Sequence, residues 1–170
     1  MSLTFLLGGA RSGKSTLAVE LARGWKGPVT FIATGEPGDD EMAERIRRHQ
    51  AERPVNWETV EAPVDVQRVL ERVPVEAAVV VDCLSIWVAN LLERGDGEDE
   101  IEAASDALSA VAAARRSLTI AVSNEVGLGV VPRTELGRRY RDVLGRVNAA
   151  WAADAEHAAF VVAGRSLRLS

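Results

Sequence analysis

A glycine-rich segment near the start of the chain has the residue types and spacing needed to hold the phosphates of a nucleotide. It satisfies the pattern G-x-x-x-x-G-K-[ST] at every fixed position, and reads Gly8-Gly9-Ala10-Arg11-Ser12-Gly13-Lys14-Ser15. Glycines let the backbone curl so that successive N–H groups point at the phosphates. Lys14 supplies a positive charge for the β- and γ-phosphates, and Ser15 offers a hydroxyl to Mg²⁺. The segment predicts nucleotide binding, but it does not say which nucleotide binds or what happens to its phosphate.

A carboxylate that helps to hold Mg²⁺ is expected at the end of another buried strand. Asp82 fits this description because it directly follows the apolar run Val79-Val80-Val81. We therefore predict that Asp82, with Ser15, contacts the metal or the nucleotide. The alternative is that Asp82 caps a helix starting near Ser85.

The chain has two histidines, and one of them lies on a strongly polar predicted helix over residues 40–53. His49 shares a face of that helix with Met42 and Ile46, next to a stripe that includes Arg45 and Arg48. A neutral imidazole is a competent nucleophile toward phosphorus, and nearby guanidinium groups disfavour its protonated form. From spacing alone, a structural histidine is the better interpretation of His49, and covalent catalysis is the alternative.

The second histidine, His157, is predicted to end the last long helix, where a positive charge complements the helix dipole. We assign it no chemistry.

Apolar runs of two lengths alternate along the chain and define the elements that would position these residues. Short β-rich runs lie at residues 3–7, 29–33, 77–82, 118–123 and 159–163. Helical spacing covers residues 15–25, 40–53, 64–73, 85–94, 98–116 and 134–156. A final run, 166–169, is expected to pair antiparallel with the preceding strand across Gly164-Arg165.

Several of the short runs are apolar almost throughout, which is typical of strands buried on both faces. We therefore predict an α/β protein with a phosphate-loop NTPase fold. Its central sheet would be mostly parallel, with helices on both faces and a short antiparallel C-terminal strand. A length of 170 residues suits one nucleotide-binding domain over residues 1–170.

Composition excludes several classes of protein. The formal net charge of −5 argues against a general nucleic-acid or anionic-membrane binder. No apolar run approaches the ~18 residues of a membrane span. The stretch before the first apolar run has no basic residue, so we expect no signal peptide. The single cysteine, Cys83, cannot form an internal disulfide, and we therefore predict a cytoplasmic protein.

Residues along nearly the whole chain resemble the bifunctional adenosylcobinamide kinase / adenosylcobinamide-phosphate guanylyltransferase family of the cobalamin pathway. The phosphate loop alone is generic, whereas His49 with Arg53-Pro54 and the Asn124-Glu125-Val126-Gly127 segment are specific to this family. Further matching segments are Phe31-Ile32-Ala33-Thr34, Asp40-Glu41-Met42-Ala43, Val81-Asp82-Cys83-Leu84, Asn90-Leu91-Leu92, Val131-Pro132, Arg141-Asp142 and Gly145-Arg146-Val147-Asn148. One departure is Thr16, which stands where many members carry a basic residue.

The resemblance implies two reactions. A nucleoside triphosphate, GTP or ATP, would phosphorylate the hydroxyl of the aminopropanol arm of adenosylcobinamide. GTP would then transfer its guanylyl group to that phosphate through a covalent histidine–GMP intermediate at His49, which gives adenosylcobinamide-GDP and pyrophosphate. Implied GTP contacts, besides the phosphate loop, are Ala33, Thr34, Gly35, Gln50, Ala51, Glu52, Arg53, Glu61 and Asp82. The resemblance also implies a homotrimer with sites between subunits.

Two other functions remain open at this level. A plain phosphate-loop kinase for a small alcohol would need Lys14 but not His49. A GTP-dependent switch or assembly protein would bind nucleotide without small-molecule chemistry.

Overall fold

The computed structural model describes residues 3–36, 38, 40–51 and 53–169, with the side chains at positions 41, 42, 45, 46, 48 and 49 outside the described part. In these residues seven strands form one sheet in the order β3-β2-β4-β5-β1-β6-β7. The strands are β1 (Leu3–Gly8), β2 (Val29–Ala33), β3 (Glu58–Glu61), β4 (Ala78–Asp82), β5 (Thr119–Asn124), β6 (His157–Val162) and β7 (Arg165–Arg168). The helices are α1 (Lys14–Arg23), α2 (Asp40–Ala51), α3 (Val66–Arg72), α4 (Leu84–Arg94), α5 (Glu98–Ala114) and α6 (Glu135–Asp154).

All neighbouring strands pair in parallel except β6 and β7, which are antiparallel. The predicted parallel sheet with an antiparallel C-terminal strand is therefore confirmed. The hairpin closes at Ala163-Gly164, one residue before the predicted turn, because Val162 pairs with Arg165. Both turn residues have positive φ, 50° and 71°, as the two-residue turns of tight hairpins require.

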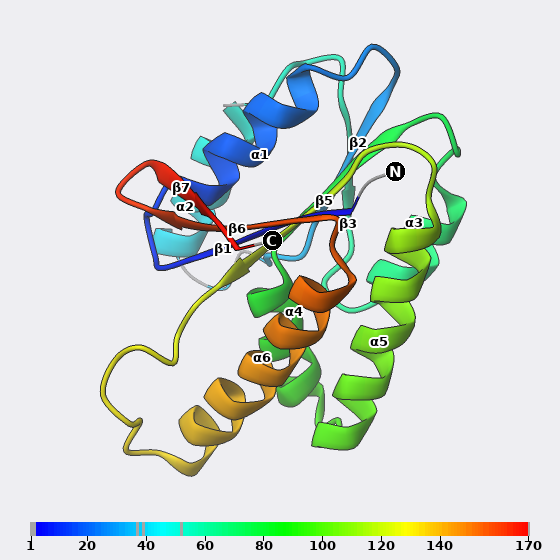
Figure 1. The fold of residues 1–170 in the computed structure, drawn as a ribbon. Coiled ribbons are helices and arrows are strands. Elements are labelled where there is room, and N and C mark those ends of the chain that lie inside the picture. The colour runs from blue at the N-terminus through cyan, green and yellow to red at the C-terminus, as the bar shows by residue number, and fades with distance from the viewer. Residues whose placement is uncertain (1–2, 37, 39, 52, 170) are drawn as a thin grey trace.

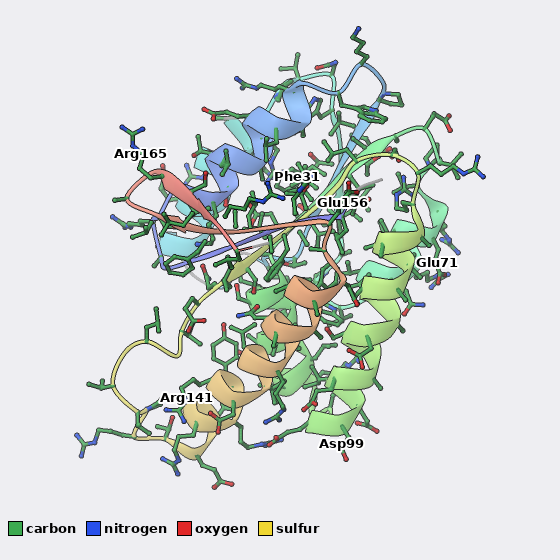
Figure 2. The ribbon with its side chains drawn as sticks, in the orientation of Figure 1. Phe31, Glu71, Asp99, Arg141, Glu156 and Arg165 are labelled. Atoms are coloured by element: carbon green, nitrogen blue, oxygen red, sulfur yellow. The ribbon has the colours of Figure 1, made fainter. Side chains whose placement is uncertain are left out.

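Two apolar clusters fill the two faces of the sheet. Figure 1 shows α1 on one side and α4, α5 and α6 on the other. Ala18, Val19 and Ala22 of α1 pack with Phe31 and its neighbours, whereas Trp151 of α6 lies in the larger cluster on the opposite face. Figure 2 shows side chains crowded around Phe31, with Arg165 extending outward from the hairpin. Helices on both faces were predicted, and this is confirmed.

Most element boundaries differ from the predicted ranges by one or two residues, and two assignments need correction. The strand β3 was not predicted; its four residues, ETVE, are mostly exposed at the edge of the sheet and carry too weak an apolar pattern. The last long helix ends at Asp154, and His157 is the first, exposed residue of β6, paired with Thr4. The predicted helix-end position of His157 is therefore wrong, because pairing with β1 extends the strand past the apolar run that marked it.

Candidate functional site

The phosphate loop leaves the carboxyl end of β1 and enters α1, as the motif predicts. Gly13 occupies the N-cap position of α1 with φ 99°, a left-handed conformation that favours glycine. Arg11 is also left-handed, with φ 55°. The Ser12 N–H donates to the Gly9 carbonyl at 3.3 Å, and the Leu17 N–H donates to the Gly13 carbonyl at 2.9 Å. The backbone therefore curls at the positive end of a helix, which suits an anion.

Lys14 is only 6% exposed although it is charged. Its Nζ donates to the Gly9 carbonyl at 2.6 Å and to the Ser12 hydroxyl at 3.4 Å. The ammonium therefore lies over the loop rather than in solvent. An ammonium can exchange such carbonyl contacts for phosphate oxygens without further burial.

The β6–β7 hairpin holds the other side of the loop. The Gly164 N–H donates to the Ser12 carbonyl at 2.9 Å. A Cβ added at Gly8 would lie 2.1 Å from the Val161 carbonyl oxygen, so only glycine fits there. The hairpin, which carries no nucleotide motif, is thus part of the frame of the site.

Asp82 is the last residue of β4, and it pairs with Ala33 at the end of β2. The N-cap of the following helix is Cys83, so the alternative that Asp82 caps this helix is wrong. Its side chain is half-buried at the same carboxyl edge as the phosphate loop.

Thr34 determines the path of the chain beyond Asp82. Its Oγ1 accepts from the Cys83 N–H and donates to the Cys83 carbonyl, each at 2.8 Å. Its N–H donates to the Asp82 carbonyl at 3.2 Å, and its own carbonyl accepts from Asn90 Nδ2 at 2.9 Å. Thr34 is 0% exposed, so these hydrogen bonds, which we call the clamp, are shielded from solvent. The clamp joins the ends of β2 and β4 with α4.

The thiol of Cys83, the residue after Asp82, is buried, and its Sγ lies 2.9 Å from Ser85 Oγ. Burial, followed by the Asp82 carboxylate, raises the pKa of Cys83 from 9.0 to about 11, and Lys14 opposes this shift. Asp82 and Lys14 therefore have opposite effects on the pKa of this thiol.

The remaining predicted nucleotide contacts differ in how far the structure describes them. Ala33 and Gly35 flank Thr34 and are half-buried, and Glu61 is exposed at the end of β3. Gln50 and Ala51 are exposed on α2, whereas Glu52 lies outside the described residues. His49 belongs to α2, but its side chain is outside the described part. Its position relative to the phosphate loop therefore stays a prediction.

Arg53 has a defined environment after the end of α2. Its guanidinium carbon lies 3.5 Å from the centroid of the Phe31 ring, and Nη1 donates to Thr59 Oγ1 at 3.5 Å. These contacts place Arg53 against β2 and β3.

Several polar residues to which we assigned no role from the sequence form hydrogen bonds around the site. The Glu125 N–H donates to the Gly8 carbonyl at 3.0 Å, which joins the end of β5 to the phosphate loop. Asn124 Nδ2 donates to Ser85 Oγ at 3.0 Å, and Asn148 Nδ2 donates to the Asn124 carbonyl at 3.0 Å. The only signal for these residues was their place in segments shared with the resembled family. Such contacts between distant elements leave no spacing pattern.

The described residues contain no cluster of three or more His, Cys, Asp or Glu side chains placed to hold a metal ion. A site with one carboxylate and one hydroxyl suits Mg²⁺, which is commonly bound through one or two protein ligands and substrate phosphates. Asp82 and Ser15 are oxygen donors of this kind at the carboxyl edge. None of the described helices is long and apolar enough to cross a membrane.

Comparison with known proteins adds independent information. Residues 4–169 match the model of the family described as cobinamide kinase / cobinamide phosphate guanyltransferase. The chain is 44% identical to the bifunctional adenosylcobalamin biosynthesis protein CobP of Pseudomonas aeruginosa, covering 96% of this chain and 95% of that protein. It is 36% identical to the bifunctional adenosylcobalamin biosynthesis protein CobU of Escherichia coli K12, covering 98% and 99% respectively.

Solved structures at low identity bear out the fold. A solved ATPase domain superposes with a TM-score of 0.56 at 15% identity, covering 94% of this chain and 68% of that chain. A prototypical ATPase from the type III secretion system of pathogenic bacteria gives a TM-score of 0.54 at 12% identity, covering 98% of this chain and 56% of that chain.

Proposed function

This chain belongs to the cobinamide kinase / cobinamide phosphate guanyltransferase family, and we propose that both of its reactions use the nucleotide site at the carboxyl edge of the sheet. The chain is a bifunctional enzyme of adenosylcobalamin biosynthesis. The main support for assigning both reactions to this site is the buried Lys14 ammonium. Its Nζ lies 2.6 Å from the Gly9 carbonyl oxygen of the phosphate loop.

In the kinase reaction, the hydroxyl of the aminopropanol arm of adenosylcobinamide attacks the terminal phosphorus of the triphosphate. The bond to the bridging oxygen breaks, the nucleoside diphosphate leaves, and the hydroxyl proton passes to solvent or a nearby base. Lys14 and the N–H groups of residues 8–15 bind the phosphates and stabilise the charge that develops on them. The donor is GTP or ATP. The pocket for the nucleobase would come from Ala33, Gly35, Gln50, Ala51, Glu52, Arg53 and Glu61, with the buried Thr34 holding the backbone of that pocket.

In the guanylyltransferase reaction, a neutral His49 nitrogen attacks the α-phosphorus of GTP and pyrophosphate leaves. The imidazole then carries GMP through a phosphorus–nitrogen bond. An oxygen of adenosylcobinamide phosphate attacks the same phosphorus, breaks that bond and returns His49 to its starting state. Splitting the transfer into two displacements means that GTP and the phosphorylated corrinoid need not be bound together.

Both reactions require that charge on the leaving phosphates be neutralised. Ser15 and Asp82 would hold Mg²⁺, which supplies charge neutralisation when it is bound. The half-buried position of both side chains beside the phosphate loop supports this assignment.

We also propose that the enzyme acts as a cytoplasmic homotrimer. The buried Cys83 thiol has no disulfide partner, which suits a reducing compartment. The described residues form one sheet with its helices, and a neighbouring subunit would complete the corrinoid site at its edge. Light scattering on the purified protein measures the number of subunits.

The two histidines of the chain allow a controlled test of the mechanism. After incubation with GTP labelled at the α-phosphate, we expect label on the wild-type protein that is acid-labile and stable to alkali, as a phosphoramidate is. His49→Ala should abolish this label, whereas His157→Ala, an exposed histidine on β6, should keep it. An unlabelled wild type that still phosphorylates adenosylcobinamide would instead support a monofunctional kinase. Nucleotide binding with neither reaction would support a switch.

A further inference from the structure

The loop between β5 and α6 exposes a group of large aliphatic side chains. Leu128 is 81% exposed, Val130 93% and Val131 62%. Residues 126–132 read VGLGVVP and include no charged or hydrogen-bonding side chain. Neighbouring exposed aliphatic side chains of this kind are typical of interaction sites. We call residues 128–131 the apolar loop.

Both ends of the apolar loop are held by hydrogen bonds. On one side, Glu125 accepts from the Gly127 N–H and bonds through its own N–H to the Gly8 carbonyl. On the other side, Arg138 Nη1 donates to the Pro132 and Arg133 carbonyls at 3.1 and 2.9 Å. Thr134 Oγ1 accepts from the Gly137 N–H at 3.1 Å and caps α6. The aliphatic side chains are therefore presented on an anchored segment.

The position of the apolar loop ties it to the phosphate loop. Asn124 pairs with Gly8 in the sheet, and the segment leaves from that point. Leu128 is three residues beyond Glu125, so its Cα lies within ~11 Å of the Glu125 Cα. Figure 1 shows the β5–α6 loop leaving the same edge of the sheet as the turn between β1 and α1, and then running toward α6. A molecule that rests on the apolar loop is within reach of a nucleotide on the phosphate loop.

We propose that the apolar loop is the docking surface for the corrinoid acceptor, an inference that rests on the proposed function. The acceptor is a large macrocycle with apolar faces and neutral amide side chains, and it must bring its hydroxyl to the terminal phosphate. Uncharged aliphatic side chains beside the phosphate loop match these faces. The phosphates of a nucleotide need cationic or hydrogen-bonding groups, which the side chains of the apolar loop do not provide.

The test compares two paired substitutions of exposed aliphatic residues. The double variant Leu128→Ser/Val130→Ser changes the apolar loop. The control Val55→Ser/Val75→Ser changes residues that are 105% and 74% exposed elsewhere. Equilibrium dialysis measures the Kd for adenosylcobinamide, and fluorescence titration measures the Kd for GTP. We expect the first variant to weaken adenosylcobinamide binding about tenfold and to leave GTP binding within about twofold of wild type. The control should change neither.

Three results would overturn the proposal: unchanged adenosylcobinamide binding in the loop variant, equal weakening in the control, or a loop variant whose molar mass in solution falls. The last result would make the apolar loop a contact between copies of the chain. The binding assay does not depend on the histidine chemistry, so failure of the proposed mechanism would appear separately, as a wild-type protein that binds adenosylcobinamide but takes no label from GTP.

Discussion

Lys14 and Arg115 are both cationic side chains that donate to main-chain carbonyls, and they lie at opposite edges of the sheet. Lys14 lies at the carboxyl edge and is held by the Gly9 carbonyl and the Ser12 hydroxyl. Arg115 lies where β4 and β5 begin. Its guanidinium donates to the carbonyls of Leu70, Val73, Pro74 and Ala77 at 2.8–3.4 Å. Burial lowers the pKa of Arg115.

The difference lies in what each group can exchange. The planar guanidinium of Arg115 donates to carbonyls at the end of α3 and in the α3–β4 connection. Its rigid donor geometry matches these carbonyls, so the hydrogen bonds stabilise the fold. The ammonium of Lys14 is a point charge on a flexible stem, and its neighbours belong to a loop shaped for anions. A buried cation therefore identifies a functional site only when its partners can be replaced by a ligand.

The largest expected effect is on activity and comes from a substitution at the carboxyl edge of the sheet. Lys14→Ala should lower kcat/KM for the kinase reaction by about 10²–10³-fold, because the transferred phosphate loses its main cationic contact. The melting temperature should change little. Steady-state kinetics and calorimetry measure the two quantities. The matched control is Lys26→Ala, at the other lysine of the chain, which is exposed. Wild-type kinetics in Lys14→Ala would contradict the role of the residue.

The second expected effect is on stability and comes from a substitution at the opposite edge of the sheet. Arg115→Ala removes the hydrogen bonds that one charged side chain donates to four main-chain carbonyls, and we expect a loss of about 2–4 kcal/mol in the free energy of unfolding. Urea titration at neutral pH measures this loss. The neighbouring Arg116→Ala, at an exposed position, should change stability by less than about 0.5 kcal/mol. Activity per folded molecule should survive, and a selective loss of activity would show that the two edges are not separate.

A third variant tests a residue that is structural although it lies beside the site. Thr34→Val keeps the shape of the side chain but leaves the Cys83 N–H without its acceptor, so we expect a loss of about 2 kcal/mol. Thr34→Ser retains the hydroxyl and should recover most of that stability. Since the clamp sets the chain after Asp82, Thr34→Val should also raise the Mg²⁺ concentration needed for half-maximal activity. An unchanged Mg²⁺ requirement would limit Thr34 to stability.

The smallest expected effect is on the free energy of unfolding at alkaline pH. The pKa of Cys83 is about 11 in the fold and 9.0 ordinarily, so between these pH values the unfolded chain releases a proton that the folded chain keeps. Stability therefore falls as pH rises through this range, by about 1.4 kcal/mol at pH 10 from this group. Urea titrations of wild type and Cys83→Ser at pH 7 and pH 10 measure the difference. Equal pH dependence in both proteins would contradict the assignment; Tyr140, whose burial raises its pKa to about 12, remains in both.

The parts of the site that could be predicted from the sequence are those encoded by neighbouring residues. The motif from Gly8 to Ser15 determines a turn and a helix start through local geometry, and the apolar run before Asp82 marks a buried strand end. The edge strand β3 and the start of β6 were missed, because pairing with another strand, rather than an apolar pattern, defines them.

The sequence by itself determined the phosphate loop, the parallel α/β fold and, through shared segments, the family. Only the tertiary structure decided how Gly164 and Glu125 hold that loop, why Thr34 clamps Cys83, and which edge of the sheet Arg115 supports. The physical reason is that local propensities depend on residues a few positions apart. These hydrogen bonds instead join residues far apart in the chain, and they form only when the sheet brings its strand ends together.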